Sequence, residues 1–330
     1  MLLLAVLLGC SRPGPPPPQR ANTAPATPWP TRVIPPGIDP GTVTVGSASQ
    51  ILASPLTSAC TSRRRTNFNP AVQGVVTAAD GSQWTVPAEV AAGPTAPDLY
   101  NDCTAVGENA AALAGQIETV VVDPDGEEIT GYLFADNYFE LYVNGTLVGR
   151  DPIGFTPFNA SVVRFKARYP ITYAVKLVDW ETHPGIGLEY DRYQVGDGGF
   201  IAWFSDGTVT GPHWKVAPYY IAPLDDPACV DVANGRDSSR CPARPACVAD
   251  RPDATCKALH FRVPATWASP SFDDASWSPA SVFRAAEVTD QPAYTRYTAL
   301  FGAASFIWSR NLLLDNLVLA RLRVEAPRRP

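Results

Sequence analysis

Hydrophobic and aromatic residues along this chain occur in short runs that are separated by turn residues. The runs TYAVKLVDW (172–180), GGFIAWFSDG (198–207) and NLVLARLRV (316–324) are rich in Val, Ile, Leu, Tyr, Phe and Trp. Such residues favour strands, and the Gly, Pro, Asn and Asp between the runs supply turn geometry. The pattern predicts an all-β fold, an antiparallel β-sandwich with long loops, and one short helix over residues 107–118.

The clearest local signal is a hairpin over residues 139–149, FELYVNGTLVG. Apolar side chains at positions 139, 141 and 143 alternate with Glu140 and Tyr142, which is the period of a half-buried strand. Asn144-Gly145 follows at once, and this dipeptide favours a type I′ turn because both central residues of that turn need a positive φ. The segment is therefore predicted to be an antiparallel hairpin.

Two segments resemble the galactose-binding-like jelly rolls. ADNYFELYVNGTLVG (135–149) resembles their strand-turn-strand, and WASPSFDDASW (267–277) is similar to their W-x-x-x-x-F-D-D-S-S-W segment. IWSRNLLLDNLVLARLRV (307–324) resembles the tryptophan-rich strand and arginine that come after it in sugar-binding domains of glycoside hydrolases. The resemblance implies a galactose-binding-like sandwich that binds carbohydrate.

The two segments stand in the reverse of the usual order. One explanation is a single, circularly permuted sandwich, in which Phe272, Trp277 and Trp308 complete the core that the 139–143 strand begins. The other is two abutting domains. We favour a single body over residues 46–330, because the segment beyond the cysteine-rich loop 225–258 is too short to bury a thick core alone.

The N-terminal segment predicts export and a lipid anchor. MLLLAVLLGC (1–10) is too short to cross a bilayer and resembles the signal segment of bacterial lipoproteins, in which Cys10 would carry the acyl chains. No Lys or Arg precedes the apolar run, so an ordinary secretion signal or a misplaced start codon stays open as an alternative. Residues 11–45 are rich in proline and predict an extended tether. The expected location is the bacterial envelope, at the outer membrane or cell surface, with the membrane contacted through the lipid anchor only.

Six further cysteines agree with an oxidising compartment. Their spacing lacks the C-x2-C pairs that bring two thiolates to one zinc ion, so disulfides are predicted instead. The pairing within the loop 225–258 cannot be read from the sequence. Outside the loop, Cys60 is paired with Cys103 by exclusion. The predicted disulfide cysteines are Cys60, Cys103, Cys229, Cys241, Cys247 and Cys256.

Charge and motif content exclude several function classes. The net charge of −6 gives no positive field for phosphates, so nucleic acid is not an expected partner. The three histidines have no metal-binding spacing, and no G-x-S-x-G elbow or Walker A loop occurs. We predict no catalytic residue and no cofactor. A structural calcium ion, held by turn aspartates at the sandwich rim, is the one ion that the composition suggests.

Aromatic and acidic residues crowd the stretch 179–220, a combination that suits sugars because C–H faces stack on rings while hydroxyls bond to carboxylates. Strand alternation assigns Trp203 to the core. Most of the other carboxylates lie in turn contexts, such as Asp197 in GDGG and Asp273 and Asp274 in FDDA, and are interpreted as residues that bond their own backbone. The predicted ligand-binding residues are Asp179, Tyr190, Asp191, Tyr193, Asp206 and Trp214.

The sequence therefore favours a surface-anchored, non-catalytic carbohydrate-binding or adhesive module whose partner is a glycan or another cell-surface polymer. A glycan-active hydrolase that uses paired carboxylates is one alternative, because glycosidases need two carboxyl groups across the sugar. A structural envelope protein without a small ligand is another. Fold alone does not decide among them.

Overall fold

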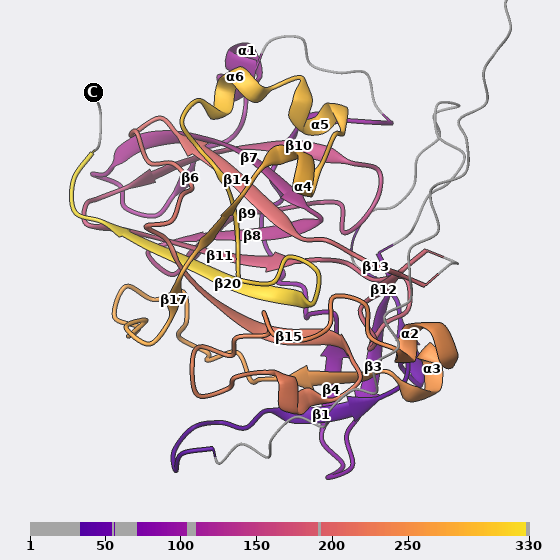
Figure 1. Cartoon of the computed structure of the whole chain (residues 1–330). Helices are drawn as coiled ribbons and strands as arrows, with labels where there is room; N and C mark the ends of the chain where they lie inside the picture. The colour runs from indigo at the N-terminus through magenta and orange to yellow at the C-terminus, as the bar shows by residue number, and fades with distance from the viewer. Residues whose placement is uncertain (1–33, 55, 57–70, 104–109, 191–192, 328–330) are drawn as a thin grey trace, which may run out of the picture.

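The computed structural model describes residues 34–54, 56, 71–103, 110–190 and 193–327, and two large sheets dominate it (Figure 1). In the first sheet the strand order is β1 (Thr42–Val45), β16 (Lys257–His260), β15 (Lys215–Leu224), β20 (Asp315–Val324), β11 (Ile171–Val178), β8 (Tyr138–Val143) and β9 (Thr146–Arg150), with β17 (Ser278–Pro279) paired to β15. In the second sheet it is β18 (Ser281–Phe283), β19 (Phe306–Trp308), β14 (Gly199–Phe204), β7 (Glu127–Asp136), β10 (Asn159–Ala167) and β5 (Asp98–Asn101), with β6 (Val120–Val121) paired to β10.

All of these pairings are antiparallel except that of β6 with β10. The predicted all-β antiparallel sandwich is confirmed. The predicted hairpin is β8 and β9, and its turn residues Asn144 (φ 50°) and Gly145 (φ 86°) both have the positive φ that the Asn-Gly signal requires. The predicted helix is present as the short α1 (Ala110–Ala114).

Smaller elements surround the two sheets. Among them are a third sheet, a two-stranded ribbon and several short helices. They are β2 (Gln50–Leu52), β3 (Gln73–Thr77), β4 (Gln83–Val86), the ribbon of β12 (Leu188–Glu189) and β13 (Gln194–Val195), the 3-10 turn η1 (Pro227–Cys229), α2 (Cys247–Asp250), α3 (Pro252–Thr255), α4 (Ala285–Val288), α5 (Pro292–Thr295) and α6 (Thr298–Phe301). Helices α4, α5 and α6 lie over the outer face of the second sheet (Figure 1).

The first sheet is buried on both of its faces. Along β11, Tyr173, Val175 and Leu177 pack into the core between the two large sheets, whereas Ala174 and Val178 pack into a second core on the opposite face. That second core also contains Val76 and Val86 of the third sheet and residues of the loops 225–258 and 261–277. Burial on both faces explains why β11, β15 and β20 read as almost continuous hydrophobic runs.

The C-terminal strand β20 lies inside the first sheet, between β15 and β11. Trp308 joins the core between the sheets together with Phe139, as predicted. Phe272 and Trp277 do not, because their segment lies on the opposite face of the first sheet and contributes to the second core. Arg321 of β20 fixes this segment there through its Nε, which donates to Asp274 at 2.8 Å.

Disulfides staple the loop 225–258 as predicted. Cys229 bonds to Cys241, and Cys247 bonds to Cys256. Cys103 is also disulfide-bonded, while Cys60, its expected partner, lies outside the described residues. Cys10, the expected lipid attachment site, lies outside them as well.

Candidate functional site

Four carboxyl groups converge where the chain passes between the two large sheets. Asp136 ends β7 of the second sheet, and the next strand, β8, belongs to the first sheet. Asn137 joins this crossing to the end of β11, because its backbone N–H donates to Val178 at 3.1 Å and its side-chain oxygen accepts from the backbone N–H of Trp180. The same contacts bring Asp179 beside Asp136, although the two residues are 43 positions apart in sequence.

Asp197 and Glu189 come from the β12–β13 ribbon and its exit. The carboxyl groups of Asp179 and Glu189 interact with each other, and both side chains are buried. Gly196 makes this packing possible, since a Cβ there would lie 2.6 Å from Glu189 Oε1 and 2.8 Å from Asp179 Oδ2. A larger residue at position 196 would therefore push the carboxyl pair apart.

The electrostatics of this cluster favour retained protons. Burial, followed by the charges of Glu189 and Asp197, raises the pKa of Asp179 well above its usual value. Burial also raises the pKa of Glu189, and the neighbouring Asp136 and Asp197 add to the effect. Burial raises the pKa of Asp197 to about 6. The buried Asp179–Glu189 pair therefore favours keeping a proton, because burial and the surrounding like charges disfavour its ionisation, whereas Asp197 is shifted less and ionises more readily.

A cavity of about 490 Å³ opens beside the cluster. Asp136, Glu189 and Asp197 line it, together with residues 286–291 in and after α4. Phe155, Phe158 and Tyr190 provide aromatic rings, with the Phe155 and Tyr190 centroids 5.7 Å apart. The described residues that line this acidic cavity include no basic side chain; its carboxyl groups belong to Asp136, Glu189, Asp197, Glu287 and Asp290.

The structure brings only some of the predicted ligand-binding residues together. Tyr190 lines the acidic cavity and is 36% exposed. Asp179 is not among the lining residues but interacts with Glu189, which is. Asp191 lies outside the described residues. Tyr193 is held elsewhere, because its ring stacks on His183 with centroids 4.3 Å apart and its hydroxyl donates to Asp253.

Asp206 and Trp214 are interior residues. Asp206 is fully buried and accepts hydrogen bonds from the hydroxyls of Tyr169 and Tyr173, at 2.7 and 2.8 Å. Trp214 is also fully buried, and its indole N–H donates to the carbonyl of Val209 at 2.9 Å. Both side chains link the two large sheets and lie away from the acidic cavity.

Asp136, Glu189 and Asp197 were not predicted as site residues from the sequence. Asp136 and Glu189 each end a strand, and Asp197 lies between β13 and β14, so a position next to strands is the only signal the sequence offers. Glu181, in contrast, is a structural carboxylate: it accepts from the backbone N–H groups of Gly185 and Gly187 and from the hydroxyl of Tyr220. Burial raises its pKa to about 7 despite these donors.

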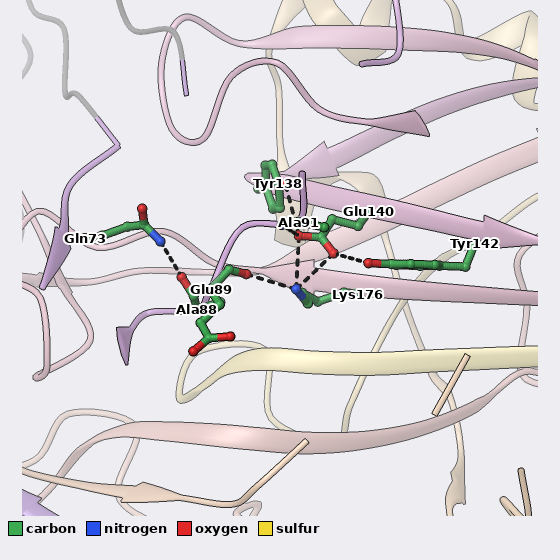
Figure 2. Close-up of polar contacts among 8 residues, drawn as sticks. All are labelled: Gln73, Ala88, Glu89, Ala91, Tyr138, Glu140, Tyr142 and Lys176. Carbon is green, nitrogen blue, oxygen red and sulfur yellow. Dashed lines mark hydrogen bonds and ion pairs between the residues drawn. The ribbon is translucent and has the colours of Figure 1, made fainter. Parts of the chain in front are cut away.

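A second buried charge cluster lies on the outer face of the first sheet (Figure 2). Lys176 of β11 lies 2.9 Å from Glu140 of β8, and Glu140 also accepts from the hydroxyls of Tyr138 and Tyr142. Lys176 additionally donates to the carbonyl of Glu89 at 2.9 Å. These contacts occupy both charged groups and fasten the segment after β4 to the sheet, which is a structural role.

Comparison of the chain with protein-family models, with curated proteins and with solved structures found no match. In the described part of the chain, no helix has the length and apolarity needed to cross a membrane. Within the same residues, no group of three or more His, Cys, Asp and Glu side chains is arranged to hold a metal ion. The structural calcium ion stays a prediction.

Proposed function

We propose that this protein is a lipid-anchored envelope protein that binds carbohydrate in the acidic cavity without catalysing a reaction. The observation that carries the proposal is the cavity itself, whose lining combines carboxyl groups with aromatic rings around a volume of about 490 Å³. Binding sites for small polar ligands combine apolar walls with a few fixed polar groups in this way. The resemblance of residues 135–149 and 267–277 to galactose-binding-like domains supports the same class of ligand.

The side chains that line the acidic cavity restrict the kind of carbohydrate that it can bind. An ionised carboxylate is an acceptor only, so it pairs with hydroxyl or ammonium donors and repels other anions. Hydrogen bonds to charged acceptors are about twice as strong as neutral ones. Because no described lining residue is basic, the cavity favours neutral or amine-bearing sugars and disfavours sulfated or carboxylated glycans.

Binding should depend on the carboxylates of the cavity. With the soluble fragment 45–330 on a glycan array, Asp197→Asn is expected to weaken sugar binding about tenfold or more, because a charge-assisted hydrogen bond is lost. Glu189→Gln should also weaken sugar binding, because an amide replaces one member of the Asp179–Glu189 carboxyl pair. Gly196→Ala keeps every carboxyl group but displaces the Asp179–Glu189 pair, so it should weaken binding too. Isothermal titration calorimetry with the glycans that bind on the array measures the dissociation constant of each variant.

The matched control is Asp125→Asn, which removes a carboxylate that is 83% exposed and outside the cavity lining. It should bind as the parent does. If no neutral or amine-bearing glycan binds the parent, or if the cavity variants bind like the control, the carbohydrate proposal fails.

The proton shared by Asp179 and Glu189 favours hydrolysis as a second candidate function. Glycoside hydrolysis needs one protonated and one ionised carboxyl group, and the unequal pKa shifts of the Asp179–Glu189 pair and of Asp197 support such a division. An assay of reducing ends in the same titration samples distinguishes binding alone from hydrolysis. Hydrolysis would be established if the parent releases new reducing ends and Glu189→Gln, which still binds sugar, does not. If the glycans stay intact, the site binds sugar without cleaving it.

The proposed anchor is tested independently of the site. Cys10→Ala should move the full chain from the membrane fraction to the soluble fraction, because acyl chains supply the membrane affinity. Fractionation of cells that produce each form, followed by immunoblotting, measures the distribution. Sedimentation of the variant with membranes would refute the lipid anchor and leave the cavity proposal untouched.

A further inference from the structure

A groove crosses the outer face of the second sheet, away from the acidic cavity. Directly paired residues of antiparallel strands share a face, and Trp203 of β14 pairs with Tyr132 of β7. The neighbouring pair in the direction of the helices, Ile201 and Phe134, is covered, since the Phe134 ring lies 6.1 Å from that of Tyr294 in α5. Next to the part of the outer face that α5 covers, the pair Trp203 and Tyr132 lies at a part that the described helices do not cover.

The open part forms a groove of about 590 Å³ between α1 and α6. Its floor consists of Tyr132, Trp203, Thr130, Ser205 and Arg164, and the two helices contribute residues to its sides. Figure 1 shows α1 and α6 close together above this sheet. Trp203, which strand alternation predicted to be a core residue, is only partly buried and lines the groove instead.

The floor combines an aromatic pair with a neutral polar rim. The Trp203 and Tyr132 rings stack with centroids 5.8 Å apart and an interplanar angle of 19°. Arg164 and Glu128, the charged residues among the described lining, form an ion pair with 3.0 Å between Nε and Oε1. Arg164 also donates to the carbonyl of Ala114 in α1 at 3.0 Å, so the guanidinium is held in place.

The strand pairing indicates what kind of ligand fits. Strand β7 pairs with β10 on one side and with β14 on the other, so the floor offers side chains and no free strand edge. A peptide that binds by adding a strand needs such an edge. A pyranose ring needs only a flat apolar surface and nearby polar side chains, and the internal ion pair leaves no net charge to attract an ionic ligand.

We propose that this groove is a second carbohydrate site, which binds a neutral oligosaccharide through Trp203, whose partly exposed ring is supported by the buried ring of Tyr132. It shares no lining residue with the acidic cavity. The proposal extends the proposed function to a second surface, but it depends on different residues and holds even if the acidic cavity binds nothing.

The test titrates the soluble fragment 45–330 with cellohexaose, maltohexaose and chitohexaose separately and follows heat and tryptophan fluorescence. For at least one sugar, Trp203→Ala should weaken binding about tenfold or more, because the ring contact is lost, whereas Trp203→Phe should retain part of it. Ala299→Trp supplies a second variant that fills the groove from the exposed surface of α6 and should block binding without disturbing the core. Unchanged thermal unfolding shows that Ala299→Trp is folded.

Glu189→Gln separates the two sites. Binding that survives Glu189→Gln and is lost in Ala299→Trp supports the groove, whatever happens at the acidic cavity. Binding that is lost in Glu189→Gln but survives in Ala299→Trp and Trp203→Ala assigns the sugar to the cavity and overturns the groove. Failure of all three hexasaccharides to bind the parent also overturns it, as does binding of a proline-rich peptide in their place.

Discussion

The protein is expected to lose stability as the pH rises from about 5 to about 8, the reverse of the behaviour of a protein held together by ionised carboxylates. Glu181 and Asp315 are each about 1% exposed, and burial raises the pKa of each to about 7. Burial raises the pKa of Asp197 to about 6. Carboxyl groups of an unfolded chain ionise near pH 4.

The sign follows from the number of bound protons. Between about pH 4 and 7 the folded protein holds protons that the unfolded chain has released, so each unit of rising pH favours unfolding. For a fully buried group such as Glu181 or Asp315, a shift of this size costs on the order of 3 kcal/mol once the pH exceeds the folded pKa. Thermal or urea unfolding followed by circular dichroism from pH 5 to 8 measures the slope.

Asp315→Asn is the variant of choice for this measurement. The carboxylate of Asp315 accepts from the hydroxyls of Ser238 and Ser309, and because hydroxyls can also accept, an amide keeps both hydrogen bonds. The variant should therefore flatten the pH dependence and gain stability at pH 8. Asp125→Asn, at an exposed position, should leave it unchanged. A parent protein whose stability rises or stays level from pH 5 to 8 would contradict the assignment of buried protons.

The sequence allowed the fold class to be predicted because its strand signals are local. The Asn144-Gly145 turn and the alternation before it depend on a few neighbouring residues, and both are present in the structure. The face that a strand residue occupies depends on which layers cover the sheet. Alternation therefore placed Trp203 in the core, although the outer face of its sheet is only partly covered by helices.

The acidic cluster is predictable only in part for the same reason. Asp179 and Tyr190 were selected from local composition, and both belong to the cluster or its cavity. Asp136 looks like an ordinary residue at a strand end, and only the crossing between sheets at Asn137 brings it to Asp179. Contacts of this kind join residues that are far apart in sequence, so no pattern within one segment reports them.

The second large expected effect concerns how much of the chain folds as one unit, and it depends on strand β20. We propose that residues 46–330 fold as one body, because β20 pairs with β15 on one side and β11 on the other. Deleting residues 259–330 should leave both neighbours with unpaired edges and expose the core between the sheets. The fragment 45–258 is therefore expected to aggregate and to show no cooperative unfolding.

Removing only residues 326–330 provides the control, since β20 ends at Val324. That form should stay soluble and unfold as the parent does. Size-exclusion chromatography and thermal unfolding compare the two truncations. A soluble 45–258 fragment with a cooperative transition of its own would instead show two independent domains, each with its own core.

Trp277→Ala tests the same coupling without removing a strand. Trp277 packs on the outer face of the first sheet against Phe272 and Tyr219, with ring centroids 5.5 and 6.2 Å away. Truncation of a buried tryptophan costs about 3 to 5 kcal/mol in the unit to which it belongs. If β20 couples both cores, calorimetry should record one transition at a lower temperature. Two transitions, of which only one moves, would separate the segment 261–277 from the hairpin of β8 and β9 and refute the single body.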